Sequence, residues 1–514
     1  MMLPAAKSSL RSSLVFRSPR LVRHVASQTA SNAKAEGDIS AVFPSLSGVE
    51  IKPLPDRFTD VKRKLIDGNE KRLTGSWQRL LKQLATENAI VKERGPEIIP
   101  QIEFENFMQP SSDFIGEVKK RGVAVIKGVV PEHEARGYKD EIEDYIKKNP
   151  STKAFPSDNP QIFELYWSQP QMKARLHPNV ILTQTSLMKL WTSKDKDALI
   201  STSSPLTYAD RLRIRQPGDN QFALGPHVDG GSVERWEPNG YGLGGVYNKI
   251  FQGRWEEYNP FESSARIPAV TDLYQGPGGC SMFRMFQGWL GLSHTRPREG
   301  TLLVNPLLQL TTAYFLLRPF FDPVQSRDAF TSKNFSQYLS IENWKLKTAQ
   351  EMDSALHGAN PGSSQEFNDV LHPHLDLKTS MVHVPTIKPG DFVVWHCDTI
   401  HAVDQVHTGK TDSSVMYIPV CPVTDLNSKY LVQQREAFET GKPAPDFPGG
   451  KGESDHIGRA TTESVFCDAN ETSLSTIGLS RLRTSETDEL PGAQKVIEKS
   501  NQRLGFMRGV KQLA

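Results

Sequence analysis

Two histidines and one aspartate have the types and spacing to hold a metal ion. His227 and Asp229 form a His-x-Asp motif in GPHVD, and His401 ends the distant segment WHCDTIH. In an extended strand, residues i and i+2 point to the same side, so His227 and Asp229 can present an imidazole and a carboxylate to one point. A second histidine from a distant strand would complete one face of a metal, leaving about three positions open, as Fe(II) oxygen chemistry requires. The pattern therefore predicts His227, Asp229 and His401 as metal ligands.

The surroundings of both halves strengthen this prediction. A His-x-Asp pair alone is weak evidence, because a chain with 13 histidines and 59 acidic residues contains such pairs by chance. Here the first half follows a predicted strand over 206–216 and a Pro-Gly turn, and the second follows a Pro-Gly-Asp turn and the apolar strand expected over 391–396. The spacing of His396 directs it away from His401, towards packing or support of a ligand. His372 and His374 are expected in a surface turn.

The remaining elements indicate helices around a sheet. The apolar spacing predicts helices over 56–94, a buried strand over 123–130 and a helix over 131–148. Further strands are expected over 280–292 and 414–420, and a C-terminal helix near 492–504. The distance in sequence between Asp229 and His401 exceeds what a small β domain needs, so insertions over the site are expected.

Composition excludes several classes of function. The formal net charge of +2 offers no field for nucleic acid, and no apolar stretch reaches the roughly 18 residues of a membrane-spanning helix. The four cysteines are too few and scattered for a disulfide framework or structural zinc. The first 35 residues are basic, rich in serine and free of acidic residues. Residues 1–35 are therefore predicted to be a mitochondrial transit peptide leading to the matrix, with a disordered basic tail as the alternative.

Several segments together resemble the Fe(II)/2-oxoglutarate-dependent dioxygenase superfamily, on its phytanoyl-CoA-dioxygenase-like side. They are RGVAVIKGVVPEHEARGYKDEIEDYI, HVD, FQGWLGLSHTRPREGTLLVNP and KPGDFVVWHCDTIHAV, and the resemblance covers roughly residues 115–425. The segments GPHVDGGSVERW and WHCDTIHAV are closest to a branch named only as a domain of unknown function. The resemblance implies an α+β chain, mainly β with flanking helices, built on a double-stranded β-helix or jelly roll. It also implies Fe(II) and 2-oxoglutarate as cofactors, with O2 as a reactant.

With this fold, four regions are expected: the transit peptide, a helical arm over 50–110, the oxygenase domain with long insertions over 111–430, and a C-terminal wrapping segment over 431–514. The expected reaction is hydroxylation or oxidative demethylation of a small molecule. The arginines 211, 213 and 215 share one strand face. If that face lines the barrel mouth, the substrate is anionic; if it is a solvated edge, these arginines make ordinary ion pairs.

One departure from the superfamily concerns the co-substrate. The arginine usually found about ten residues beyond the distal histidine is absent from the segment after Lys410, KTDSSVMY. A buried carboxylate still needs a cation, preferably the fork of an arginine, and Arg213 and Arg284 are the candidates. Two alternatives stay open: a cupin-like metal enzyme that does not use 2-oxoglutarate, and a metal-binding interaction protein without turnover.

Overall fold

The computed structural model describes residues 43, 53–221, 223–276, 279–483 and 490–506. The segment predicted as a transit peptide, 1–35, lies outside these residues. No helix within the described ranges is both long and apolar enough to cross a membrane.

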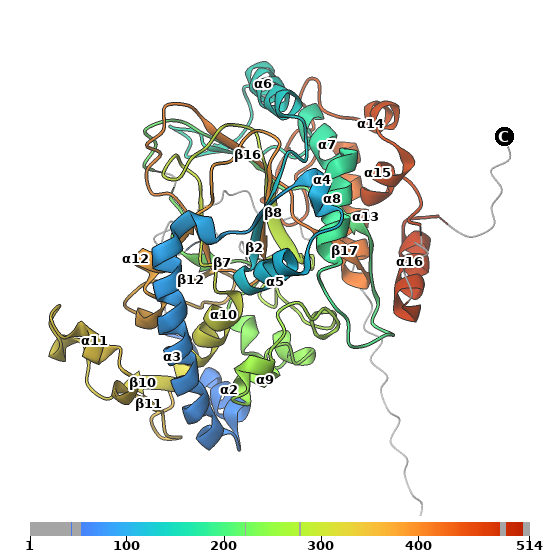
Figure 1. The fold of residues 1–514 in the computed structure, drawn as a ribbon. Helices are drawn as coiled ribbons and strands as arrows, with labels where there is room; N and C mark the ends of the chain where they lie inside the picture. Colours follow the sequence, from blue (N-terminus) through green and yellow to red (C-terminus); the bar gives the residue numbers. More distant parts are fainter. Residues whose placement is uncertain (1–42, 44–52, 222, 277–278, 484–489, 507–514) are drawn as a thin grey trace, which may run out of the picture. The chain divides into compact units, whose positions relative to one another are not determined.

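Two sheets form the centre of this mixed α+β fold (Figure 1). The larger has the order β1 (Gln101–Glu103), β2 (Val123–Lys127), β14 (Phe392–His396), β8 (Phe286–Gly291), β16 (Ser413–Tyr417), β6 (Leu212–Arg215), β4 (Ile162–Phe163) and β3 (Ala154–Phe155). The smaller has the order β12 (Gln365–Glu366), β7 (His227–Val228), β15 (His401–Val403), β9 (Leu302–Val304) and β13 (Val382–His383). Neighbours within the sheets are antiparallel, apart from the parallel pair β1 and β2.

The strand β14 shows why its sequence is apolar throughout. Val393 and Trp395 belong to a core cluster that also contains Val228 and Val304 of the smaller sheet. Phe392 and Val394 point the other way, into a cluster that includes side chains of α6 (Glu132–Lys148) and α8 (Pro178–Met188). A strand buried on both faces needs apolar residues at every position rather than at alternate ones. The larger sheet is therefore sandwiched between the smaller sheet and helices.

The turn before β14 depends on a glycine. Gly390 has φ +89°, and a Cβ there would lie 1.9 Å from the carbonyl oxygen of Val130. Asp391 then accepts a hydrogen bond from the backbone N–H of Gly128 at 2.9 Å. The Pro-Gly-Asp motif thus fixes where the strand that precedes His401 begins.

Helices surround the sheets. The N-terminal pair is α2 (Arg57–Ile66) and α3 (Glu70–Arg94), and α3 packs on the buried α10 (Leu308–Leu317). The other helices up to β16 are α4 (Phe104–Phe107), α5 (Ser112–Arg121), α7 (Gln169–Leu176), α9 (Asn248–Phe251), α11 (Phe335–Tyr338) and α12 (Leu377–Ser380). The helix α6 matches the one expected over 131–148.

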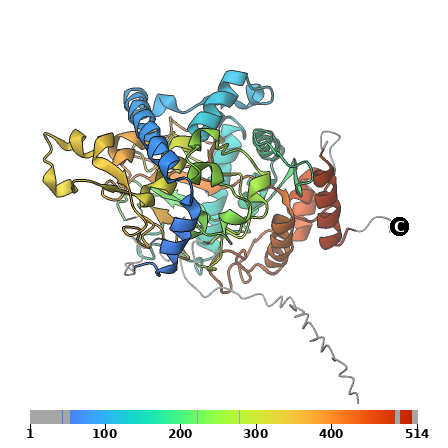
Figure 2. The same cartoon turned by 90° about the horizontal axis from the view of Figure 1, so that it is seen from below.

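Two small sheets and the C-terminal helices complete the fold. The strand β5 (Ile200–Leu206) pairs with β17 (Cys421–Thr424), next to α13 (Asp425–Thr440) and α16 (Pro491–Arg503). The short helices α14 (Thr462–Asp468) and α15 (Glu471–Thr476) follow α13. The hairpin β10 (Phe321–Pro323) and β11 (Trp344–Leu346) lies on the opposite side from α16 in both views (Figure 2). The strand expected over 206–216 is in fact divided, because β5 and β6 belong to different sheets.

Candidate metal centre

The smaller sheet brings the three predicted ligands together. His227 begins β7, His401 begins β15, and these two residues are direct partners in the antiparallel register. Asp229 follows β7, with its Oδ1 3.6 Å from Nε2 of His227 and its Oδ2 3.7 Å from Nε2 of His401. Both histidines are buried, whereas the Asp229 side chain keeps 23% of its surface exposed. The three side chains therefore meet at one point that can still be reached from outside.

The hydrogen bonds on the far side of each ring suit metal binding. Nδ1 of His227 lies 2.7 Å from the carbonyl oxygen of Gly225, and Nδ1 of His401 lies 3.1 Å from that of Thr399. A ring nitrogen next to a carbonyl oxygen must carry the proton, which leaves the lone pair on Nε2. Both lone pairs then face Asp229, and the donor set of two imidazoles and a carboxylate fits a divalent transition metal.

Electrostatics place the ligands in the required protonation states. Burial, together with the neighbouring His227, lowers the pKa of His401 to about 3. Burial alone would raise the pKa of Asp229, but His227, His401 and Arg284 outweigh it, and the pKa falls to about 2. At neutral pH, His401 is neutral and Asp229 is charged, as metal ligation requires.

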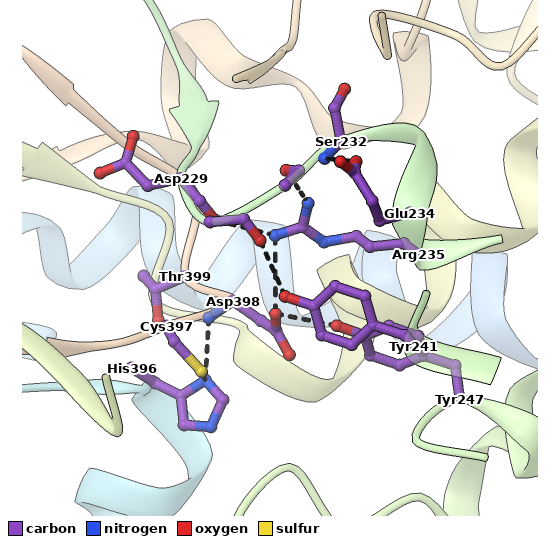
Figure 3. A network of polar contacts seen from close by, with 12 residues as sticks. Asp229, Ser232, Glu234, Arg235, Tyr241, Tyr247, His396, Cys397, Asp398 and Thr399 are labelled. Atoms are coloured by element: carbon purple, nitrogen blue, oxygen red, sulfur yellow. Dashed lines mark hydrogen bonds and ion pairs between the residues drawn. The ribbon is translucent and has the colours of Figure 1, made fainter. Parts of the chain in front are cut away.

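A buried network ties the two ligand-bearing segments together (Figure 3). The guanidinium of Arg235 donates to the main-chain oxygen of Asp229 at 3.0 Å and to that of Gly231, and lies 3.8 Å from the carboxylate of Asp398. Asp398, three residues before His401, accepts hydrogen bonds from Arg266 at 2.6 Å and from Tyr247 at 3.0 Å. Arg235 therefore connects the loop after β7 to the loop before β15.

Glycine permits the turn that carries Arg235 back towards Asp229. Gly231 has φ +93°, and a Cβ there would lie 2.6 Å from the carbonyl oxygen of Thr271. The segment HVDGGSVERW contained the signal for this arrangement, because it pairs a glycine turn with an arginine six residues beyond the aspartate. The sequence prediction nevertheless missed Arg235, Arg266 and Asp398 as supporting residues.

A second group of metal-binding residue types, His396, Cys397 and Asp398, lies nearby. Nε2 of His396 is 3.0 Å from the carbonyl oxygen of Pro260, and Nδ1 accepts from the backbone N–H of Asp398 at 3.0 Å. Burial raises the pKa of the Cys397 thiol to about 12, so it stays protonated. With both ring nitrogens engaged, His396 supports the loop rather than a second metal.

The strand β6 and the residue before it give the three arginines different environments. Arg211 pairs with Glu164 at 3.3 Å and Arg215 with Asp219 at 2.7 Å. Arg213, buried between them, donates from its terminal nitrogen to Oγ of Ser413 at 3.3 Å, and its Nε has no partner among the residues that the structure describes. Burial lowers the pKa of Arg213 because no acidic side chain pairs with it within the described residues.

The second candidate anchor, Arg284, lies just before β8 and lines a cavity that also includes Asp229. Arg213 is instead cross-strand from Val415, which belongs to the core cluster between the sheets. The two arginines that the sequence left as alternatives therefore occupy two separate places.

The fold and the site together define a mixed α+β protein with a candidate two-histidine, one-carboxylate metal centre. Residues 52–476 match the Gig2-like family model, and the chain belongs to the Gig2-like family. It is 32% identical over 357 residues to the Escherichia coli K12 protein YbiU, covering 67% of this chain and 77% of YbiU.

Solved structures agree with this family. The GlcNAc-inducible gene 2 protein (GIG2, DUF1479) of Candida albicans aligns with a TM-score of 0.77 and 31% identity, over 89% of this chain and 96% of that one. A hypothetical protein from Escherichia coli aligns with a TM-score of 0.67 and 29% identity, over 83% and 99% of the two chains. The α-ketoglutarate-dependent carbocyclase SnoK aligns at a TM-score of 0.32 and 12% identity, which establishes neither fold nor chemistry. The branch expected from the sequence is thus confirmed, whereas the superfamily remains a proposal.

Proposed function

We propose that this protein is an Fe(II)/2-oxoglutarate-dependent oxygenase that hydroxylates or oxidatively demethylates a small molecule. The observation that carries the proposal is the geometry of His227, Asp229 and His401. Their free donor atoms converge from one side, and their other polar atoms hold them in place. Such a facial set leaves about three coordination positions for a bidentate co-substrate and O2.

The strand order supports a jelly roll around this site. Along the chain, β6, β8, β14 and β16 join the larger sheet, whereas β7, β9, β13 and β15 join the smaller one. Their spatial orders, β14-β8-β16-β6 and β7-β15-β9-β13, are those of an eight-stranded double-stranded β-helix. The metal ligands would then stand at the open end, where the strand ends and loops converge.

Arg213 is the residue proposed to anchor 2-oxoglutarate. It reaches Ser413 at the start of β16, close in sequence to the position about ten residues beyond the distal histidine where the superfamily usually carries its arginine. A buried guanidinium without an acidic partner is costly, and a carboxylate would satisfy both the charge and the unpaired Nε. The absence of an arginine after Lys410 is therefore compensated from the neighbouring strand β6.

When bound, Fe(II) and 2-oxoglutarate would supply the oxidising chemistry with O2. The chain's own residues would position and enclose these groups. Trp395 packs against His401, with ring centroids 5.1 Å apart, and Phe43 packs edge-on against His227 at 4.7 Å. These aromatic rings limit the access of water to the ligands and hold the imidazole planes.

The proposal is tested by succinate release from labelled 2-oxoglutarate with Fe(II), ascorbate and O2. We expect the wild-type chain to release succinate and Arg213→Met to need a much higher concentration of 2-oxoglutarate. A charge-assisted hydrogen bond contributes about 1.5–3 kcal/mol, which corresponds to roughly a ten- to hundredfold change. Arg213→Lys, which keeps the charge, is the matched control and should fall between the two.

The same assay separates the alternatives. A cupin-like enzyme that does not use 2-oxoglutarate would bind the metal and release no succinate. A protein without turnover would bind Fe(II) and consume no oxygen with any substrate tested. The mitochondrial location likewise stays a proposal, which imaging of the full chain with and without residues 1–35 would test.

A further inference from the structure

A cavity opens beside the candidate metal ligands. Its empty volume is about 590 Å³, counting its open mouth, and Asp229 forms part of its wall. Apolar side chains from separate segments line much of it, among them Ile267, Met282, Phe283 and Leu426. A cavity lined mainly by apolar side chains with a few polar groups is typical of a small-molecule site.

Two polar side chains of the cavity are free to bind a ligand. Arg284 and Gln287 both line it, and neither side chain makes a hydrogen bond or ion pair within the part of the chain that is described. The guanidinium carbon of Arg284 lies 5.6 Å from the centre of the Tyr208 ring, which supports it from one side. Arg266 lines the same cavity, but its charge is already balanced by Asp398 at 2.6 Å. One unpaired cation and one neutral amide therefore face the cavity.

We propose that this cavity binds the substrate as a monoanionic carboxylate with an apolar body, held by Arg284 and Gln287. This inference rests on the proposed function and names its substrate class. The fork of Arg284 matches a carboxylate, and the apolar wall matches a hydrocarbon chain or ring. The apolar body would lie next to Asp229, where oxidation would take place.

The charge of the site favours a carboxylate over a phosphate. Arg284 supplies one positive charge, and the other arginine of the cavity wall, Arg266, is already paired with Asp398. A phosphate monoester carries nearly two negative charges at neutral pH, so one arginine would leave it under-compensated.

Position distinguishes Arg284 from the proposed co-substrate anchor. Arg213 lies within β6, cross-strand from Val415 of the core, whereas Arg284 precedes the first residue of β8. Phe286, which begins β8, pairs with His396, the last residue of β14, so Arg284 stands at the same end of the sheet as the loop leading to His401. A dicarboxylate anchored at Arg213 would leave Arg284 to the substrate.

The test is calorimetric titration of the full-length chain with octanoate, and with octanamide as a neutral probe of the same length. We expect octanoate to bind at least tenfold more tightly than octanamide. Arg284→Met, which keeps an unbranched apolar stem and removes the charged guanidinium, should weaken octanoate binding by ten- to hundredfold, and Arg284→Lys should retain part of it. Gln287→Leu, a second variant at a separate position, should also weaken octanoate binding, by less than Arg284→Met.

Four results would overturn the inference. Two concern the wild type: no binding of octanoate, or equal binding of octanoate and octanamide. The other two concern the variants: undiminished octanoate binding by both Arg284→Met and Gln287→Leu, or loss of 2-oxoglutarate binding in Arg284→Met with octanoate binding intact. The last result would make Arg284 the co-substrate anchor. Succinate release is measured separately. Its absence, with selective octanoate binding retained, would contradict the proposed oxygenase and leave the carboxylate site standing.

Discussion

Two groups of metal-binding residue types lie close together in this protein and differ in what their donor atoms do. In the first, His227, Asp229 and His401, each ring uses Nδ1 for a backbone carbonyl and turns Nε2 towards the carboxylate. In the second, both ring nitrogens of His396 already have backbone partners. Both groups bring metal-binding residue types close together, so the unengaged donor atoms are what distinguish the first as the candidate metal centre.

The second group instead helps to position the first. The carboxylate of Asp398 is held by Arg266, Tyr247 and Tyr258, and its pKa is lowered, against the effect of burial, chiefly by Arg266. Because Asp398 and His401 share one short loop, fixing Asp398 also fixes the start of β15. The comparison thus separates residues that would bind the ion from residues that position its ligands.

The largest expected effect is on metal binding by the first group. Asp229→Ala should abolish Fe(II) or Mn(II) binding at one equivalent, since it removes the carboxylate that lies between the two imidazoles. His396→Gln is the matched control in the second group and should keep one equivalent of metal. Metal content after dialysis, with thermal unfolding to check the fold, gives the measurement. Equal loss in both variants would erase the distinction between the two groups.

For the free energy of unfolding we expect the opposite order, with a larger loss from a change in the second group than from a change in the first. Asp398→Ala leaves the buried guanidinium of Arg266 without its acidic partner, and breaking a buried pair in this way costs about 3–5 kcal/mol. Asp229→Ala removes a partly exposed carboxylate and should change the free energy of unfolding far less. Chemical denaturation of both variants without metal tests this. A larger loss of stability in Asp229→Ala would contradict the supporting role of the second group.

The sequence predicted that His227 and Asp229 point to one side, and that a strand precedes His401, because both features depend on local rules. Alternation within a strand places His227 and Asp229 together, and the Pro-Gly-Asp turn and apolar run predict β14. The helix α6, the strand β2 and the C-terminal helix α16 also follow local patterns. Each of these predictions needed only residues that are neighbours along the chain.

The sequence could not show which polar groups are paired across the fold. The shared face of arginines 211, 213 and 215 was predicted, but Arg213 stands out only because Glu164 and Asp219 pair with its neighbours. The expected surface turn at His372 and His374 is wrong. His372 is fully buried, and His374 packs against Trp77 and Trp344 from distant segments. Such burial depends on α3 and β11, which no local pattern connects to these histidines.

An intermediate effect is expected at the link between the two groups. Arg235→Met keeps much of the side-chain volume and removes the donor to the main-chain oxygen of Asp229. Loss of such a supporting contact typically weakens metal affinity by about 10- to 100-fold. Competition with a chelator measures the affinity, and one equivalent should still bind at saturating metal. Unchanged affinity would show that the loop after β7 holds Asp229 without Arg235.

The smallest effect is expected at Cys397. This residue of the second group has a side chain of a metal-binding type, but we expect it to play no part in holding the ion. Burial raises the pKa of its thiol, which therefore stays protonated. Its Sγ lies 3.8 Å from Nδ1 of His396, and the same Nδ1 accepts a hydrogen bond from the backbone N–H of Asp398. Cys397→Ala should leave the affinity for Mn(II) within about a factor of two, because it changes neither the free Nε2 atoms nor the carboxylate of Asp229. Competition with the same chelator measures this affinity. A tenfold loss of Mn(II) affinity would mean that the thiol takes part in holding the ion, and the two groups would then be one site.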